Sequence, residues 1–427
     1  MPTRHILVIF IATVISMFCY QRASRNRYAT TLADAMGIIE ENYVESIDSR
    51  ELFEGAMRGM TAELDDYSQY VDSEMFEELH ETIDQQFGGV GMVVDSGNDL
   101  EWPLVIRVQR GGPAEAAGVR AYDSIIKIDG KATSELPPGG AVELIRGAPG
   151  TTVDVEMRSL DDELRTLTLT RDIIPVETVR GYRLDEAGNW EFFFPERPEV
   201  GYFWIEAFGE NTARELRDAI ESSSVPWEAI VIDLRGNGGG LLETAIAMCD
   251  LFIDRGDIVA VKGRDERTVR RFTASAAQLL PSDIPVFILV DGFSASASEI
   301  FAACLQDHDR GVVVGQRSYG KGTVQHVIEL EPQRSALRLT TATYWRPSGE
   351  NIHRLGDATE EDRWGVSPNV GYEIELTSEQ QVEAARARMQ RFRAVHPDVE
   401  REDIYLDPQL ERALEAVDAS LTPVPAS

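Results

Sequence analysis

The stretch Ala229-Ile-Val-Ile-Asp-Leu-Arg-Gly-Asn-Gly-Gly-Gly240 lies just past the middle of the 427-residue chain. It begins with an unbroken apolar run, which is typical of a strand buried on both faces of a sheet. A glycine-rich turn follows, and the residues from about Leu241 to Ile253 have helical spacing. A strand, a glycine turn and a helix in this order indicate a layered α/β domain.

Strands and helices continue to alternate on both sides of this stretch. The apolar patterns predict strands at 201–206, 286–290 and 311–315, and helices at 211–221 and 298–306. We therefore predict an α/β core over residues 174–378, followed by a C-terminal helical region and tail over residues 379–427.

The part of the chain before this core has two different patterns. Residues 28–85 show helical periodicity and predict an N-terminal helical region. Residues 86–173 contain short apolar runs separated by Gly and Pro, with two short helical stretches between them. This pattern predicts a compact β-rich module inserted before the α/β core.

Residues 1–27 contain an apolar segment, Ile6–Tyr20, which is preceded by Arg4. As a helix it would span only about 22 Å, less than the roughly 30 Å hydrocarbon core of a bilayer, so it fits a signal peptide or a short anchor. No convincing cleavage site follows. We predict an uncleaved signal anchor, with the bulk of the protein outside the cytoplasm on the periplasmic side of the cell envelope. Three arginines after the segment favour the opposite orientation, and a buried N-terminal helix is the alternative.

The charge balance and the cysteine count exclude several classes of function. Lys and Arg number 41 and Asp and Glu number 73, which gives a formal net charge of −32. Such an acidic chain would repel nucleic-acid phosphates, so we predict no nucleic-acid partner. Three cysteines are too few for a disulfide framework or a zinc cluster, and no H-E-x-x-H motif is present. We predict no metal and no cofactor.

Three glycine-rich motifs each have a structural and a functional interpretation. Gly315–Gly322 nearly matches a phosphate-binding loop, but Gly322 replaces the required Ser or Thr and a strand pattern follows, so nucleotide binding is rejected. Gly236–Gly240 is either a tight turn or a set of backbone N–H groups aimed at an oxyanion, and it matches a dinucleotide fingerprint only in part. Phe87–Met92 is either a turn or a loop that captures the terminal carboxylate of a peptide.

The segment Ser294-Ala-Ser-Ala-Ser-Glu299 lies between a predicted buried strand and a predicted helix. Ligands bind at such strand ends in α/β folds, so Ser296 is a candidate nucleophile. The same serine forms a Ser-x-x-Glu capping box with Glu299, and capping the helix is the structural alternative.

A serine nucleophile needs a base, and the histidines are poor candidates. His308 lies about three helical turns, or ~18 Å, beyond Ser296, and His326 and His353 have no evident carboxylate partner. Lys321 remains, in a turn between two glycines. It is either a solvated lysine or a base whose pKa is lowered by burial from its usual ~10.4. A neutral lysine base predicts an activity that rises with pH.

The ordered set of motifs resembles the C-terminal processing (tail-specific) peptidases, which are serine–lysine endopeptidases with an embedded PDZ domain. The resemblance covers about residues 30–375, and the set is specific although each motif alone is weak. It rests on Leu64-Asp-Asp-Tyr-Ser-Gln-Tyr70, Phe87-Gly-Gly-Val-Gly91, Gly112-Pro-Ala-Glu-Ala-Ala-Gly118, Ile125-Ile-Lys-Ile-Asp-Gly130, Leu144-Ile-Arg-Gly147, Asp233-Leu-Arg-Gly-Asn-Gly-Gly-Gly240, Ser294-Ala-Ser-Ala-Ser-Glu299, Gly320-Lys-Gly-Thr-Val-Gln325 and Thr343-Tyr-Trp-Arg-Pro-Ser-Gly349.

The resemblance implies a multidomain α/β (α+β) protein in which a crotonase-like or ClpP-like protease core carries an inserted PDZ domain. It implies that Ser296 is the nucleophile, that Lys321 is the general base and that Gln325 orients the lysine. The backbone N–H groups of Gly239 and Ala297 would form the oxyanion hole.

The resemblance also implies how substrates are recognised. The PDZ loop residues Gly89, Val90, Gly91 and Met92 would bind the C-terminus of a substrate or adaptor and gate the active site. The leading hypothesis is therefore a serine-type endopeptidase that cleaves proteins near or from apolar C-terminal tails. Candidate partners are such proteins, an adaptor protein, the membrane through the N-terminal segment, and a second copy of the chain. A non-catalytic PDZ scaffold of the cell envelope is the alternative, and a crotonase-like hydrolase or lyase would leave the PDZ-like insert unexplained.

Overall fold

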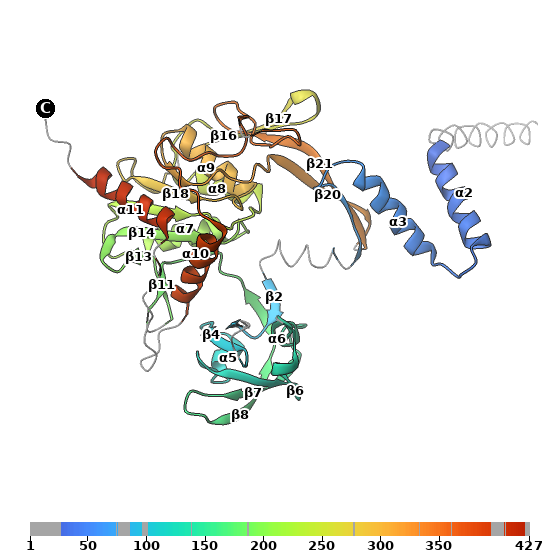
Figure 1. Ribbon diagram of the computed structural model, residues 1–427, viewed down its shortest axis with the longest axis horizontal. Helices are drawn as coiled ribbons and strands as arrows, with labels where there is room; N and C mark the ends of the chain where they lie inside the picture. Colours follow the sequence, from blue (N-terminus) through green and yellow to red (C-terminus); the bar gives the residue numbers. More distant parts are fainter. Residues whose placement is uncertain are drawn as a thin grey trace, which may run out of the picture. The chain divides into compact units, whose positions relative to one another are not determined.

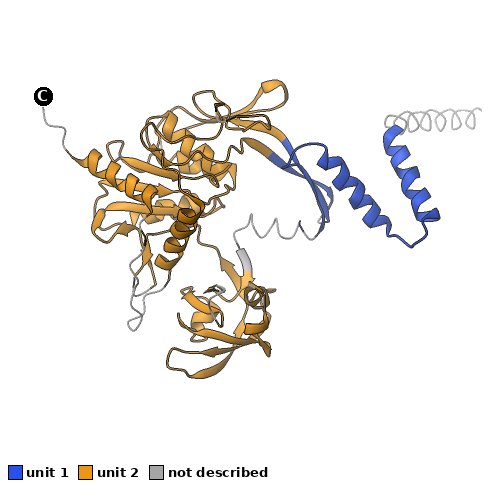
Figure 2. Cartoon of the chain, viewed as in Figure 1, with its two compact units in different colours: residues 1–76, 325–340 blue, residues 77–324, 341–427 orange. Residues whose placement is uncertain are grey.

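The computed structural model describes residues 27–73, 75, 86–95, 101–137, 139–185, 188–275, 278–332, 334–359, 361–393, 405 and 407–422 (Figure 1). It divides into a smaller unit, residues 1–76 with 325–340, and a larger unit, residues 77–324 with 341–427 (Figure 2). Residues 1–26 of the predicted signal anchor lie outside the described residues. Within the ranges given above, no helix is both long enough and apolar enough to span a membrane.

The larger unit is built on a six-stranded sheet with the order β10-β14-β15-β18-β19, in which β13 also pairs with β14. Its strands are β10 (Val179–Arg180), β13 (Phe193–Phe194), β14 (Arg197–Ile205), β15 (Ala229–Asp233), β18 (Val286–Val290) and β19 (Val312–Gly315). The strands β14, β15, β18 and β19 are parallel, whereas β10 and β13 are antiparallel to β14. Every residue of β15 and β18 is buried, as the unbroken apolar runs predict.

Helices cover both faces of this sheet. They are α7 (Thr212–Glu221), α8 (Leu242–Cys249) and α9 (Ala297–Asp307) on one face, and α11 (Pro408–Leu421), with the end of α10 (Ser378–Arg391), on the other. Alternate residues of β14 show the division, because Phe203 and Ile205 join the first hydrophobic cluster whereas Tyr202 and Trp204 join the second. The alternation of strands and helices thus builds a sheet whose strand ends carry the glycine loop and the serine segment.

The β-rich module has a separate sheet with the order β3-β4-β5-β7-β8, in which β6 also pairs with β5. Its elements are β3 (Met92–Asp95), β4 (Leu104–Val108), α5 (Pro113–Ala116), β5 (Ser124–Ile128), β6 (Lys131–Ala132), η1 (Thr133–Glu135), α6 (Gly140–Ile145), β7 (Thr152–Arg158) and β8 (Leu164–Thr170). The strands β2 (Gln86–Gly89) and β9 (Asp172–Pro175) pair at its entrance and exit. Val105, Ile125 and Val153 belong to its own hydrophobic core.

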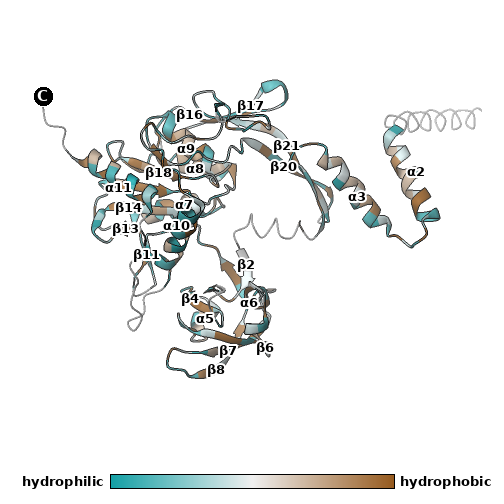
Figure 3. Cartoon of the chain, in the orientation of Figure 1, coloured by the Kyte–Doolittle hydropathy of each residue, from teal (hydrophilic) through white to brown (hydrophobic). Residues whose placement is uncertain are grey.

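The smaller unit contains α2 (Arg27–Asn42), α3 (Ser49–Ala62) and β1 (Gln69–Val71), which pairs with β21. The strands β20 (Thr323–Glu331) and β21 (Ser335–Trp345) each run from one unit into the other, and in the larger unit β21 pairs with β16 (Asp257–Lys262), which pairs with β17 (Thr268–Thr273). The remaining short elements are β11 (Arg183–Leu184), β12 (Trp190–Glu191) and η2 (Arg264–Glu266). Hydrophobic and hydrophilic residues alternate along α2 and α3 (Figure 3), and α2 buries none of its residues.

The structure refines one prediction for the N-terminal region. Residues 28–85 were predicted to form a helical region, and within them the short strand β1 follows the helices α2 and α3. This strand has only three residues, and its partner β21 follows more than 260 residues later in the chain. A pattern-based prediction examines near neighbours, so it has no signal for a strand that a remote partner stabilises.

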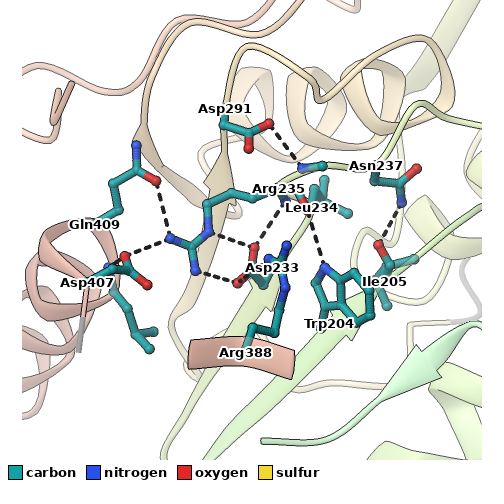
Figure 4. Close-up of polar contacts among 12 residues, drawn as sticks. Trp204, Ile205, Asp233, Leu234, Arg235, Asn237, Asp291, Arg388, Asp407 and Gln409 are labelled. Atoms are coloured by element: carbon teal, nitrogen blue, oxygen red, sulfur yellow. Dashed lines mark hydrogen bonds and ion pairs between the residues drawn. The ribbon is translucent and has the colours of Figure 1, made fainter. Parts of the chain in front are cut away.

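A buried ion-pair network joins the end of β15 to α11 (Figure 4). The Arg235 guanidinium contacts Asp233 at 2.6 Å and Asp407 at 2.7 Å, and all three side chains are almost fully buried. Burial would raise the pKa of Asp233, but the adjacent Arg235 more than offsets this and lowers it to about 2. Asp407 also caps α11 by accepting the Leu410 N–H at 2.9 Å. The network therefore holds the start of the glycine loop against the C-terminal helix.

The variant Arg235→Leu tests how much this ion-pair network contributes to the free energy of unfolding. It should lower the free energy of unfolding by about 3–5 kcal/mol, because two buried carboxylates lose their cation. Arg197→Ala is the matched control, since the Arg197–Asp418 pair at 2.7 Å also joins β14 to α11 but is exposed, and it should cost less than about 1 kcal/mol. Urea unfolding of both variants measures the difference, and equal losses would contradict the structural role of Arg235.

Candidate active site

Ser296 lies at the end of the turn that joins β18 to α9. Its backbone has φ +56° and ψ −112°, a conformation that is rare for a residue with a side chain. The turn is bonded to the glycine loop, because the Ala295 N–H and the Ser298 hydroxyl both donate to the Asn237 carbonyl oxygen at 3.0 Å. In α/β-hydrolases a strained strand-to-helix turn presents the nucleophilic serine. The local geometry is therefore suited to a reactive serine.

The alternative role of Ser296 is realised as well, because the capping box of Ser296 and Glu299 is present at the start of α9. Glu299 Oε2 accepts the Ser296 N–H at 2.8 Å. The Glu299 N–H donates to the Ser296 carbonyl oxygen at 2.9 Å. Ser296 is thus the N-cap residue of α9, and it is half-buried.

Glu299 connects the turn at Ser296 to the turn at Lys321. Its side chain is fully buried, and its carboxylate accepts hydrogen bonds on both oxygens. Oε2 accepts the backbone N–H groups of Ser296 and Lys321, each at 2.8 Å. Oε1 accepts the Gly320 N–H at 2.6 Å and the Ser318 hydroxyl at 2.5 Å. Because they share one acceptor, the backbone nitrogens of Ser296 and Lys321 lie within about 5.6 Å of each other.

The environment of Glu299 also changes its acidity. Burial raises the pKa of Glu299 to about 7, although the hydrogen bonds from its four donors lower it in part. A carboxyl group that titrates near neutral pH therefore lies between the serine turn and the lysine turn. The sequence signal for this residue was the Ser-x-x-Glu spacing, which indicated a cap but gave no sign of the second turn.

The turn that carries Lys321 is closely packed on both sides of the lysine. Gly320 has φ +86°, and a Cβ added there would come within 2.8 Å of Arg354 Cβ. A Cβ added at Gly322 would come within 2.2 Å of the His353 backbone nitrogen. Both positions therefore require glycine. This agrees with the close backbone approach that the glycines on both sides of Lys321 predicted. The Lys321 side chain itself is half-buried.

Gln325 belongs to the smaller unit, and the structure describes it there. Its Nε2 donates to the Thr340 hydroxyl at 3.2 Å, and that hydroxyl donates to Asp65 Oδ1 at 3.1 Å. These contacts join β20, β21 and the segment before β1. The predicted role of Gln325 in orienting Lys321 stays a prediction.

His308, the histidine nearest to Ser296 in sequence, has a structural role. It is the C-cap residue of α9, and its Nε2 lies 2.7 Å from the Asp257 carbonyl oxygen. His326 is exposed on β20, and the backbone N–H of His353 donates to Asn351 Oδ1 at 2.9 Å. No cluster of His, Cys, Asp or Glu suited to a metal ion is found among the residues that the structure describes.

The glycine loop lies directly beside the serine turn. Gly239 has φ +103°, and a Cβ there would come within 2.9 Å of Ser296 Cβ and 3.0 Å of the Ala297 nitrogen. Ala297 is the first residue of α9, so its N–H has no partner within the helix. The Gly239 N–H donates to Asn237 Oδ1 at 2.8 Å. Of the two predicted oxyanion donors, Ala297 is thus placed to donate, whereas Gly239 is occupied by Asn237 in this conformation.

The predicted peptide-binding loop borders a cavity of about 790 Å³, which we call the groove. Gly89, Val90, Gly91 and Met92 line it, together with residues of α6. Gly91 has φ +75°, and the Val90 carbonyl oxygen accepts the Ala114 N–H at 2.8 Å, which fixes the loop on α5. The groove has a volume within the usual range of ligand pockets, and part of its wall is apolar.

Comparison with known proteins supplies the family. The model of Peptidase family S41 matches residues 199–370, a PDZ domain model matches residues 81–158, and the model described as the activating protease CtpB N-terminal domain matches residues 19–75. Along the chain these three matches follow the order inferred from the sequence, which is the helical region, then the β-rich module, then the α/β core.

Two curated relatives and one solved structure illustrate the similarity. The carboxy-terminal-processing protease of Bartonella bacilliformis is 38% identical over 324 residues, 74% of this chain and 71% of the relative. The carboxy-terminal processing protease CtpA of Bacillus subtilis is 36% identical over 331 residues, 74% of this chain and 65% of the relative. The photosystem II D1 C-terminal processing protease matches 82% of this chain and 94% of its own, with 26% identity and a TM-score of 0.45.

These relatives confirm the family, the fold class and the serine-type peptidase activity that the motifs predicted. The chain therefore belongs to peptidase family S41, as a carboxy-terminal-processing serine protease with a PDZ domain.

Proposed function

We propose that this protease cleaves peptide bonds with Ser296 as the nucleophile and Lys321 as the general base. The observation that carries the proposal is the Glu299 carboxylate, which accepts the backbone N–H groups of both residues at 2.8 Å. Ser296 and Lys321 are 25 positions apart in the sequence, and Glu299 holds their backbone N–H groups next to each other. The strained backbone of Ser296 further supports a nucleophile.

The reaction would use a neutral lysine amine. Lys321 takes the proton of the Ser296 hydroxyl as Oγ attacks the peptide carbonyl carbon, and the resulting ammonium then protonates the leaving amine. A water molecule attacks the acyl-enzyme ester and regenerates the serine. Gln325 would orient the amine of Lys321, and its bond to Thr340 shows that its amide takes part in an ordered network.

Backbone donors would stabilise the oxyanion formed in both steps. The Ala297 N–H supplies one donor, and the Gly239 N–H supplies the second once it is released from Asn237. Loss of a single oxyanion donor costs roughly 10²–10³ in rate in other serine hydrolases. The position of the glycine loop therefore decides whether the site is fully active.

Glu299 would act as a positioning residue in this mechanism. It touches neither substrate nor the reacting atoms, but it sets the distance between the two turns that carry them. An error of 1 Å in such a distance can cost about 10²-fold in rate. The carboxylate therefore contributes to catalysis through Ser296 and Lys321.

The groove would bind the substrate tail. Gly89 to Met92 border it, and Val142 and Ile145 of α6 add apolar wall, which suits proteins with apolar C-terminal ends. We propose that a bound tail gates the active site. We further propose a location in the cell envelope, anchored through residues 6–20, and an adaptor protein or a second copy of the chain as further partners.

Three variants test the assignment of the nucleophile and the base. Ser296→Ala and Lys321→Arg should each lower cleavage of an unfolded protein substrate by roughly 10⁴-fold or more, because arginine keeps the charge but has no neutral form near pH 7. His308→Ala is the control and should stay within about threefold of wild type, because His308 holds a backbone carbonyl. Gel-based cleavage assays measure all three; equal cleavage by every form would contradict the assignment of Ser296 and Lys321, and no cleavage by wild type would favour the non-catalytic scaffold.

The variant Glu299→Gln tests the raised pKa of Glu299 through the pH dependence of the free energy of unfolding. The pKa of Glu299 in the folded protein, about 7, lies above its ordinary value of 4.5. The stability that Glu299 contributes is thus fully present below pH 4.5 and is lost as the pH rises towards 7. Relative to Glu299→Gln, wild type should lose about 3 kcal/mol of unfolding free energy across this range.

Urea unfolding of wild type and Glu299→Gln at several pH values between 4 and 8 measures this difference. The variant should also lose roughly 10- to 100-fold in kcat, because its amide presents N–H groups to backbone donors and separates the two turns. A stability difference that does not change with pH would contradict the raised pKa, and an unchanged kcat would contradict the positioning role.

A further inference from the structure

Two short segments, residues 352–354 and 364–366, pack against the turn that carries Lys321. They are joined to each other, because the Gly365 N–H donates to the Ile352 carbonyl oxygen at 2.8 Å. Two further backbone hydrogen bonds tie them to the turn, from the Arg354 N–H to the Gly320 carbonyl oxygen at 2.8 Å and from the Ser318 N–H to the Val366 carbonyl oxygen at 3.0 Å. The lysine turn is therefore held by these segments as well as by the buried carboxylate.

Trp364 packs directly against the lysine turn. It is only 8% exposed, and a Cβ added at Gly320 would come within 2.8 Å of its Cε3. The guanidinium groups of Arg317 and Arg354 both lie over its ring, at 4.7 Å and 4.4 Å from the centroid. Arg317 comes from the chain just before the turn, and Arg354 comes from the first segment. The ring is thus fixed by both of the pieces of chain that it brings together.

The indole N–H of Trp364 indicates which part of the side chain matters. Its Nε1 is buried and finds no hydrogen-bond acceptor among the described residues. A buried donor without an acceptor lowers the free energy of unfolding. The contribution of Trp364 therefore comes from the size and stacking of its ring, which phenylalanine could supply in large part.

Several charged or titratable groups lie against the lysine turn from the elements packed around it. They are Glu299 of α9, Asp291 of the serine turn, Tyr344 of β21, His353 and Arg354 of the first segment, and Arg317 and Tyr319 next to Lys321 in sequence. Replacing Trp364 removes none of these groups. A change in the pKa of Lys321 in such a variant would therefore report the position and the hydration of its amine.

We propose that Trp364 is a positioning residue for Lys321. Its ring keeps the lysine turn closed, which holds the amine of the base within reach of Ser296 and shields it in part from water. This inference rests on the proposed function, because it takes Lys321 to be the general base. It adds a support that lies outside the residues assigned to the reaction itself.

The variant Trp364→Ala tests the proposal in the full-length chain. Cleavage of an unfolded protein substrate should lose about 10- to 100-fold in kcat, with KM within about threefold, because a displaced base costs rate but not binding. The pH midpoint of Ser296 labelling by a fluorophosphonate should rise by about 0.5 to 1 unit, because a hydrated lysine returns towards its usual pKa. The rise should be the same in about 0.05 M and 0.5 M NaCl, since salt screens displaced surface charges but does not restore the shielding of an amine.

Two further substitutions separate the ring from apolar bulk. Trp364→Phe keeps an aromatic surface beside Gly320, so its kcat should stay within about threefold of wild type and its pH midpoint should be unchanged. Trp364→Leu keeps apolar bulk but has no ring for the two arginines, so both of its values should lie between those of the phenylalanine and alanine variants. The leucine variant keeps the proposal testable if the alanine variant does not fold.

The variant Trp227→Ala is the matched control. Trp227 is 9% exposed and belongs to the largest hydrophobic cluster, but it precedes β15, whereas the glycine loop follows the other end of that strand. Its replacement should lower the urea midpoint of unfolding at least as much as Trp364→Ala. The folded protein should nevertheless keep a kcat within about threefold of wild type and an unchanged pH midpoint.

The outcomes distinguish this inference from the proposed function. A wild-type kcat and a wild-type pH midpoint in folded Trp364→Ala would overturn the positioning role, and so would an equal shift of the midpoint in Trp227→Ala. Failure of the proposed function would appear elsewhere, because Lys321→Ala would then be labelled at the wild-type rate whatever residue stands at position 364.

Discussion

One buried carboxylate sets the geometry on which the proposed chemistry depends. Glu299 accepts N–H groups from the serine turn and the lysine turn with the same oxygen. Removing a charged group from water is costly unless donors surround it, and here both oxygens are fully used. The two turns cannot separate without leaving buried donors unsatisfied, so folding of the core itself brings the candidate nucleophile to the candidate base.

A second framework places the glycine loop beside these turns. The parallel strands β15 and β18 end next to each other, and the turns that follow them are joined through Asn237, whose carbonyl accepts Ala295 and Ser298. Beneath the loop, Arg235 ties Asp233 to the N-cap of α11. The loop is thus held at its base by a buried ion-pair network and at Asn237 by hydrogen bonds to the end of β14 and to the serine turn.

Several features of this arrangement could be predicted from the sequence. The unbroken run at 229–233 and the alternation around it predicted a sheet covered on both faces, and the motifs in order predicted the family. The Ser-x-x-Glu spacing predicted the cap of α9. It did not indicate that Glu299 also accepts the backbone N–H of Lys321, because that hydrogen bond joins residues 22 positions apart and depends on the packed core. Tertiary packing also produces β1 and the pair of Arg235 with Asp407, which local patterns do not encode.

The central claim is that a neutral Lys321 activates Ser296. The most direct measurement is the rate at which a fluorophosphonate labels the protein between pH 5 and 10, with the modified residue identified by mass spectrometry. The account predicts labelling at Ser296, at a rate that rises with pH and is lost in Lys321→Ala. Labelling of Lys321→Ala at the wild-type rate, or a rate in wild type that does not change with pH, would contradict it.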